Sequence, residues 1–295
     1  MEAPPRLELG IKVLQTSALP LGYSALLIFN ELYYIINTYI LSIQICYNID
    51  RGDIMSYENL KSAVDNSTNI VFLGGAGVST ESNIPDFRSE AGLYKTKNNY
   101  SYPPEVMLSH SFFMSHTEDF FEFYRKKMIY KDAKPNDAHY ALAELEKKGK
   151  LKAIVTQNID GLHQMAGSKN VLELHGSIHR NHCTKCHKFF DLNYIINSPD
   201  IIPKCDKCNG LVKPDVVLYE ESLDMNVLNK SVQYISQADT LIVGGTSLVV
   251  YPAAGLINYF KGKNLVLINK SSTPYDNRAD IVIHDKIGTV LKSVL

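Results

Sequence analysis

Four cysteines in the middle of the chain carry the strongest chemical signal. They form two Cys-x-x-Cys pairs, Cys183 with Cys186 and Cys205 with Cys208, in a segment rich in Lys, Asn and Asp. This spacing is typical of two zinc knuckles, in which four thiolates complete the coordination of a structural Zn²⁺. A redox-active Cys-x-x-Cys pair is the alternative, and the presence of two pairs argues against it. We predict that residues 182–210 form a small zinc-binding module.

Polar side chains follow an apolar run that ends at Thr156. Gln157, Asn158 and Asp160 come directly after it. In open parallel sheets, ligands bind at the carboxyl ends of the strands. Amide donors and a carboxylate acceptor suit a ribose and a carboxamide. An Asx turn that caps the next helix would explain one of these residues, but not all three.

His175 is a candidate general base. It lies between an apolar pattern and Gly176, shortly before the cysteine module. A histidine with a pKa near 6.5 accepts a proton at neutral pH. The commoner role of a single histidine is structural, and the chain has 9 of them.

A glycine-rich turn follows the first strongly apolar run. The glycines of residues 74–77 allow the backbone to approach a ligand closely, and amides placed there can face a diphosphate. Thr80 stands where the third glycine of a G-x-G-x-x-G pattern would be, so a plain strand-to-helix turn explains the glycines equally well. Residues 85–88 add a carboxylate, an aromatic face and the guanidinium of Arg88, which suits a phosphate.

The elements around these residues alternate between strands and helices. Apolar runs begin at Asn69 and cover residues 152–156, 240–243, 264–268 and, more weakly, 280–283, while residues 60–64 and 138–148 have helical spacing. Such alternation predicts an α/β fold with a parallel sheet covered by helices on both faces.

Composition limits the classes of partner. The chain has 295 residues, of which 45% are hydrophobic, and its Lys+Arg count of 30 against 31 Asp+Glu leaves a net charge of −1. A nucleic-acid or anionic-membrane binder has a basic surplus, so we expect neither partner. Cysteines spaced for metal binding indicate a reducing compartment, and we expect a cytoplasmic protein.

Residues 1–54 differ from the rest of the chain. Residues 25–46 are the most apolar stretch and exceed the ~20 residues that cross a bilayer, yet they include Asn30, Glu31 and Gln44. A membrane anchor, an extra amphipathic helix and translated upstream sequence are the three interpretations. We favour the third, because Met55 begins a sequence that reads as a natural start. No function is placed in this extension.

Taken together, the motifs resemble the sirtuins, the NAD-dependent protein deacylases. The resemblance covers about Met55 to Leu295 and is closest to the bacterial class that deacetylates protein lysines. It rests on the segments 75–79, 84–89, 156–160, 174–176, 245–248 and 267–269, and on the four cysteines. It implies a catalytic domain over 55–295, with a Rossmann-like lobe and a zinc lobe, and NAD and acyl-lysine in the cleft between them.

The resemblance also implies roles for individual residues. The acyl group would pass from lysine to ADP-ribose with release of nicotinamide, and His175 would be the general base, with Asn158 as the second catalytic residue. Residues 216–219 would pair with the substrate peptide as a strand. The residues implied to bind NAD are Gly75, Ala76, Gly77, Thr80, Asp86, Phe87, Arg88, Gln157, Asn158, Ile159, Asp160, His175, Thr246, Ser247, Asn269 and Ile287, and those implied to pair with the peptide are Val216, Val217, Leu218 and Tyr219.

Several positions depart from the family pattern, among them Gly74, which stands where Thr is common. Asn83 replaces a glycine, and since Asn tolerates a left-handed backbone we expect that loop to be kept. Glu220 also replaces a glycine, which gives two adjacent carboxylates that would disfavour acidic substrate flanks. Members that remove succinyl groups have a Tyr-x-x-Arg pair, whereas this chain has Tyr124 and Lys127, which favours short uncharged acyl groups.

Two other functions compete with deacylation. Some sirtuin relatives mainly transfer ADP-ribose to proteins, but a retained His175 favours deacylation, because the base is needed after the first step. A non-enzymatic NAD-sensing or zinc-ribbon interaction module is the other, and the charge balance together with Asn158 and Asp160 argues against it.

Overall fold

A parallel six-stranded sheet forms the larger lobe of the computed structural model, which describes residues 55–87, 92–93 and 102–295. Its strand order is β3-β2-β1-β7-β8-β9, and every neighbouring pair is parallel. The strands are β1 (Ile70–Gly74), β2 (Leu151–Thr156), β3 (Val171–Glu173), β7 (Thr240–Gly244), β8 (Asn264–Ile268) and β9 (Ile281–Ile283).

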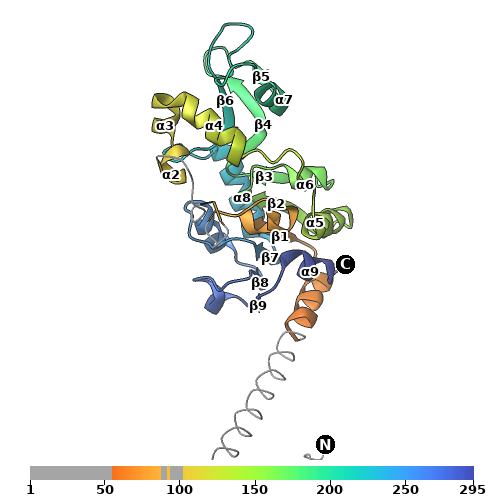
Figure 1. Cartoon of the computed structure of the whole chain (residues 1–295). Coiled ribbons are helices and arrows are strands. Elements are labelled where there is room, and N and C mark those ends of the chain that lie inside the picture. The colour runs from red at the N-terminus through yellow and green to blue at the C-terminus, as the bar shows by residue number, and fades with distance from the viewer. Residues whose placement is uncertain (1–54, 88–91, 94–101) are drawn as a thin grey trace, which may run out of the picture. The chain divides into compact units, whose positions relative to one another are not determined.

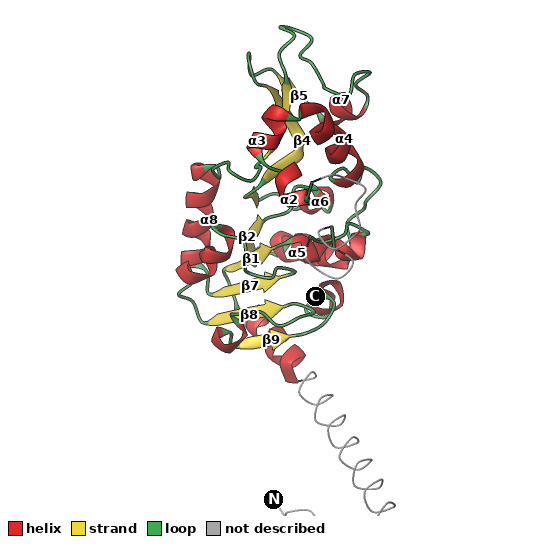
Figure 2. Cartoon of the chain, turned by 60° about the vertical axis from the view of Figure 1, so that its left-hand side comes forward, coloured by secondary structure: helices red, strands yellow, loops and turns green. Residues whose placement is uncertain are grey.

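Helices cover both faces of this sheet. One apolar cluster joins a face of the sheet to the helix over residues 55–66, to α5 (Asp137–Lys147) and to α9 (Ile287–Lys292). A second cluster joins the other face to α8 (Met225–Gln237) and to the 3-10 helix Ala253–Tyr259. Figure 2 shows α8 and α5 on opposite sides of the strands. The expected α/β fold is confirmed.

Buried parallel strands account for the apolar runs of the sequence. All five residues of β1 are buried, as are all five of β7. Strands covered on both faces read as continuous runs of Val, Ile and Leu, which is why these strands lie where the sequence predicts them. The sixth, β3, was missed because it is short and only its central residue is buried.

A smaller lobe is built on an antiparallel sheet of order β5-β4-β6 (Figure 1). Its strands are β4 (Gly176–Cys183), β5 (Phe189–Phe190) and β6 (Val212–Val216). Its helices are α2 (Pro104–Met107), α3 (His110–Ser115), α4 (Thr117–Lys127) and α7 (Leu192–Ile196), and a short helix of the larger lobe, α6 (Leu162–Met165), follows β2.

One apolar cluster unites two distant segments in the smaller lobe. It contains Phe113, Phe120 and Tyr124 of α3 and α4 together with Cys183 and Cys205. The lobe is therefore larger than the cysteine segment alone, and the boundary predicted for the zinc module at 182–210 stays a prediction. The predicted boundary at residue 55 also stays a prediction.

The extension that precedes Met55 lies outside the described residues, including the candidate anchor over 25–46. Among the described residues, none of the helices has the length and apolar character needed to cross a membrane.

Candidate functional site

A cavity of about 1000 Å³ lies where the carboxyl ends of the parallel strands meet the smaller lobe. Segments that leave β1, β2, β7 and β8 contribute to its wall, as expected for a ligand site of an open parallel sheet. The predicted residues that line it are Ala76, Gly77, Thr80, Asp86, Phe87, Gln157, Asn158, Ile159, Asp160, His175, Val216, Val217, Leu218, Tyr219, Thr246, Ser247, Asn269 and Ile287.

Two of the residues predicted to bind NAD are not among those that line the cavity. Arg88 lies outside the described residues. Gly75 lies behind the wall, where an added Cβ would come within 2.7 Å of the Thr246 Cβ. The Gly75 amide also donates to the Gly244 carbonyl at 3.2 Å. Gly75 is thus required for close packing of two strand ends.

Ser79 connects two of the polar residues that follow β2. Its hydroxyl donates to Asp160 Oδ2 at 2.6 Å and accepts from Asn158 Nδ2 at 3.0 Å. A third bond, from the Asn158 amide to Thr156 Oγ1 at 3.0 Å, fixes the backbone at the strand end. Ser79 had no predicted role, because a single serine after a glycine turn gives no signal of its own.

His175 reaches the cavity from the turn after β3. Its Nδ1 lies 3.0 Å from the Gln157 carbonyl oxygen, which can only accept, so Nδ1 carries the proton. Nε2 is then the basic nitrogen. Burial lowers the pKa of His175, and the hydrogen bond to Gln157 partly opposes this, so the imidazole is neutral at physiological pH and ready to accept a proton.

A second polar network joins the ends of three strands. Gln157 Nε2 donates to Thr246 Oγ1 at 3.1 Å, and the Thr246 amide donates to Asn269 Oδ1 at 2.9 Å. Asn269 Nδ2 is buried and has no hydrogen-bond partner among the described residues. A buried donor without a partner costs about 1–3 kcal/mol, so this amide is suited to a ligand that supplies an acceptor.

The turns after β1 and β7 pack closely against each other. A Cβ added to Gly77 would lie 2.7 Å from Gly245 Cα, and Gly245 itself has a φ of +61°. Asn83 adopts a left-handed φ of 62°, which confirms the expectation for this position. The glycine turn also lines the cavity through Ala76, Gly77 and Thr80, which fits a dinucleotide with its phosphates there.

The four cysteine sulfurs lie within 4.8 Å of one another. Cys183 and Cys208 Sγ are 3.4 Å apart, and Cys186 and Cys205 Sγ are 3.6 Å apart. A tetrahedral Zn²⁺ with Zn–S bonds of about 2.3 Å places its sulfurs about 3.8 Å apart, so the donor set fits zinc. Gly210 is needed beside it, because an added Cβ would lie 2.8 Å from Cys183 Sγ.

The segment after β6 is braced on both sides. The amides of Val217, Leu218 and Tyr219 donate to His175 O at 3.0 Å, to Glu221 Oε2 at 2.9 Å and to Leu108 O at 2.9 Å. Glu221 also contacts Lys213 Nζ at 3.1 Å and His110 Nδ1 at 2.8 Å. Both adjacent carboxylates are therefore used within the domain, Glu221 by these contacts and Glu220 by Ser111.

The two residues compared with the succinyl-removing pattern both lie on α4, but their side chains have different surroundings. Tyr124 is fully buried in the smaller lobe, and burial raises its pKa. Lys127 lines the cavity. Only the second of these two positions can therefore reach an acyl group.

Comparison with known proteins identifies the family. The Sir2 family model matches residues 75–252. The chain belongs to the Sir2 family. Among the curated relatives, a protein of Clostridium acetobutylicum named "NAD-dependent protein deacetylase" is 75% identical over 236 residues, which are 80% of this chain and 96% of that protein. A Staphylococcus aureus protein of the same name is 45% identical over 81% of this chain and 97% of its own length.

Solved Sir2 structures share the fold. One described as "Sir2-p53 peptide-NAD+" has a TM-score of 0.71 at 38% identity and covers 80% of this chain and 95% of its own. Another, "Sir2 bound to acetylated peptide", has a TM-score of 0.71 at 37% identity and covers 80% of this chain and 96% of its own. The sirtuin resemblance of the sequence is thereby confirmed.

Proposed function

We propose that this protein is an NAD-dependent protein-lysine deacetylase that transfers the acetyl group to ADP-ribose and releases nicotinamide. The observation that carries the proposal is a neutral, half-buried His175 beside the Asn158–Ser79–Asp160 network in a Sir2 cavity. The Clostridium acetobutylicum protein of the same family, at 75% identity, is named for this activity.

NAD supplies the ADP-ribose group that takes the acetyl group. We assign Nε2 of His175 the role of accepting a proton from a ribose hydroxyl, because Nδ1 is held by the Gln157 carbonyl at 3.0 Å. Asn158, Ile159 and Asp160, together with Gln157, would bind the nicotinamide ribose and carboxamide.

The other end of the dinucleotide has its own residues in this proposal. The phosphate and ribose end of the site would consist of Gly75, Ala76, Gly77, Thr80, Asp86, Phe87 and Arg88. Gly75 would act through packing. Thr246, Ser247 and Asn269 would bind the adenosine end and Ile287 the adenine. The buried Asn269 Nδ2, which has no partner, supports this assignment.

The substrate is an acetylated lysine in a protein. We propose that it enters along residues 216–219, with the acyl chain beside the apolar residues Phe87, Ile159 and Ile178 of the cavity wall. Three amides of that segment already donate within the domain. The amides of the peptide would therefore donate mainly to the carbonyl oxygens of the segment, since a carbonyl oxygen can accept two bonds. Short uncharged acyl groups remain our proposal.

The four cysteines would hold a structural Zn²⁺ that joins the two ends of the small lobe. We further propose that residues 55–295 are the catalytic domain, that 182–210 are the zinc module within it and that 1–54 are an extension without a catalytic part. The protein is proposed to be cytoplasmic, to bind no nucleic acid, and to bind no membrane unless residues 25–46 are an anchor.

The test is a mass-spectrometric assay with NAD and an acetyl-lysine peptide. We expect wild type to form nicotinamide, deacetylated peptide and O-acetyl-ADP-ribose in equal amounts, and His175→Ala to form none of the last two. Circular dichroism and zinc content of the variant serve as folding controls. The enzyme would instead be an ADP-ribosyltransferase if nicotinamide is released, the peptide stays acetylated and a protein becomes ADP-ribosylated. No reaction by folded, zinc-loaded protein, whichever acyl peptide is tried, would overturn the enzyme assignment.

A further inference from the structure

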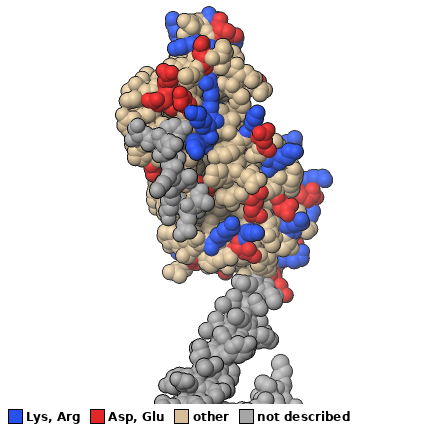
Figure 3. Space-filling model, viewed as in Figure 1, with Lys and Arg blue, Asp and Glu red and all other residues tan. Residues whose placement is uncertain are grey.

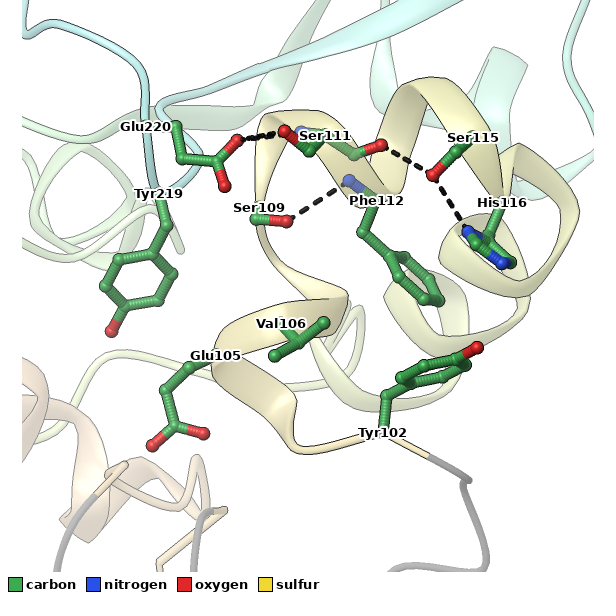
Figure 4. A pocket seen from close by; sticks show the side chains of 10 residues that line it. All are labelled: Tyr102, Glu105, Val106, Ser109, Ser111, Phe112, Ser115, His116, Tyr219 and Glu220. Atoms are coloured by element: carbon green, nitrogen blue, oxygen red, sulfur yellow. Dashed lines mark hydrogen bonds between the residues drawn. The ribbon is translucent and has the colours of Figure 1, made fainter.

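A second cavity of about 400 Å³ lies beside the proposed peptide-binding segment. Tyr219 and Glu220 line both this cavity and the large one, so the two cavities share a wall. The rest of the smaller cavity comes from α2, α3 and the residues that flank them (Figure 4). A peptide that passes along residues 216–219 can therefore place a neighbouring side chain here.

We call this second cavity the flank pocket; its lining includes Tyr102, Glu105, Phe112, His116, Tyr219 and Glu220. Aromatic rings form one side of it. Tyr102 meets Phe112 edge to face, with ring centroids 5.2 Å apart. His116 stacks on Phe112 at 4.7 Å. Tyr219 is 40% exposed and stands across the pocket from these rings (Figure 4).

Two carboxylates complete the pocket. Glu105 is exposed in the first turn of α2. Glu220 is fixed by Ser111, whose amide and hydroxyl donate to Oε2 at 2.9 Å and 2.6 Å, and these bonds lower the pKa of Glu220. Its other oxygen points away from Ser111 toward the side of Tyr219 (Figure 4). Glu220 is therefore held ionised at a defined place.

The charge of the pocket is of one sign. Its lining, all within the described residues, contains no lysine or arginine. Outside the pocket the charge is mixed, because α4 carries acidic residues in its first turn and basic ones in its last, and Figure 3 shows red and blue side chains side by side on that face. An anionic side chain would be repelled here, and a neutral one would leave the two negative charges uncompensated.

We propose that the flank pocket binds a cationic side chain, best an arginine, next to the acetyl-lysine of the substrate. A guanidinium stacks on aromatic rings and forms paired hydrogen bonds with carboxylates, which matches both walls of the pocket. This inference rests on the proposed function, because its ligand is part of the substrate peptide. It adds a sequence preference, basic residues near the acetylated lysine, that the catalytic residues alone do not determine.

The experiment scans peptides in which each position flanking acetyl-lysine is in turn Arg, Gln or Glu. We expect Arg to raise kcat/KM over Gln by about five- to tenfold at one position or two adjacent ones, and Glu to lower it, since exposed ion pairs and cation–π contacts are individually modest. Peptide affinity is measured in parallel by fluorescence anisotropy, which needs no turnover.

Variants of Glu105 connect the preference to the pocket. Glu105→Gln should reduce the Arg/Gln ratio, and Glu105→Lys should reverse it in favour of Glu, while the Gln peptide is processed as by wild type. Glu58→Gln is the matched control. It removes the same charge from an exposed side chain on the helix over 55–66, outside the pocket. It should keep the wild-type ratio.

The two proposals fail in distinguishable ways. If the Gln peptide is deacetylated but Arg gives no gain at any position, or if both Glu105 variants keep the wild-type ratio, the flank pocket has no such role. If no peptide is deacetylated, the proposed function fails, and the anisotropy data still decide whether Arg peptides bind more tightly than Gln peptides and whether Glu105→Lys reverses this.

Discussion

Two buried histidines behind the cavity should make the domain unstable in mild acid. His139 is 0% exposed and His163 is 1% exposed, and their ring centroids lie 4.7 Å apart. His139 Nδ1 accepts from the Asn136 amide at 3.2 Å, whereas neither nitrogen of His163 has a hydrogen-bond partner in the described part of the chain. Burial lowers the pKa of His139 from 6.5 to about 4 and that of His163 to about 3, and for His163 the neighbouring His139 adds to the effect.

The direction of the pH effect follows from where the protons bind. Above pH 6.5 both imidazoles are neutral in the folded and the unfolded chain, so the stability is complete. As the pH falls below that value, the unfolded chain takes up two protons that the folded domain refuses until the pH reaches its lowered pKa values. Each refused proton costs about 1.4 kcal/mol per pH unit, so the pair gives a slope of about 2.7 kcal/mol per pH unit.

The expected loss is large compared with the total. Between about pH 7.5 and pH 5 the two histidines together remove about 4 kcal/mol of unfolding free energy, against the 5–15 kcal/mol of a typical domain. The assay is urea unfolding of the full, zinc-loaded chain followed by circular dichroism across this pH range, with zinc release monitored by a metal-sensitive dye.

His163→Leu isolates the effect from carboxylates and zinc thiolates, which also bind protons in acid. The leucine leaves no polar atom unpaired beside Phe72, so we expect the variant to be at least as stable as wild type near pH 7.5. Its stability should fall less steeply below pH 6.5, by about 1.4 kcal/mol per pH unit. Equal slopes for the two proteins, with equal zinc content, would refute the reasoning.

Three further predictions concern stability and ligand binding. Removing zinc with a chelator should unfold the smaller lobe, because the apolar cluster of that lobe includes Cys183 and Cys205. Loss of near-ultraviolet circular dichroism in step with zinc release would show this. An unchanged spectrum of the zinc-free protein would contradict it. Gly245→Ala should abolish NAD binding, since its Cβ would lie 2.4 Å from the Val78 amide nitrogen, and calorimetric titration of the folded variant is the measurement. Tyr124→Phe should raise the unfolding free energy by about 1 kcal/mol, because the buried Tyr124 hydroxyl has no partner; a lower urea midpoint would contradict this.

The sequence predicted those parts of the molecule that depend on short segments. Continuous apolar runs located five of the six parallel strands, because strands buried on both faces need apolar residues at every position. The spacing of the cysteines located the metal site, because four ligands on two knuckles need little else. Polar residues directly after strands located most of the cavity wall, because strand ends meet at one edge of a parallel sheet.

Features that depend on contacts between distant segments were not predictable. Ser79 became a site residue only when the fold placed it 2.6 Å from Asp160, 81 positions away. The packing of α3 and α4 against the cysteine segment likewise has no local signal. Gly75 shows the reverse case, because a glycine near a ligand can serve the packing of Thr246 and not the ligand.

Buried polar groups without partners fall into two classes in this domain, and the distinction has a consequence. Asn269 is among the residues that line the cavity, so a ligand bound there can satisfy its buried Nδ2, and the cost of burial is recovered on binding. His163 and Tyr124 do not line the cavity, so nothing that binds there can satisfy them. NAD should therefore raise the melting temperature of wild type, His163→Leu and Tyr124→Phe by similar amounts, whereas Asn269→Ala should lose most of that increase. Thermal unfolding with and without NAD tests this. If NAD raises the melting temperature of the Asn269 variant as much as that of wild type, the unpaired Nδ2 of Asn269 is a packing defect and not a ligand contact.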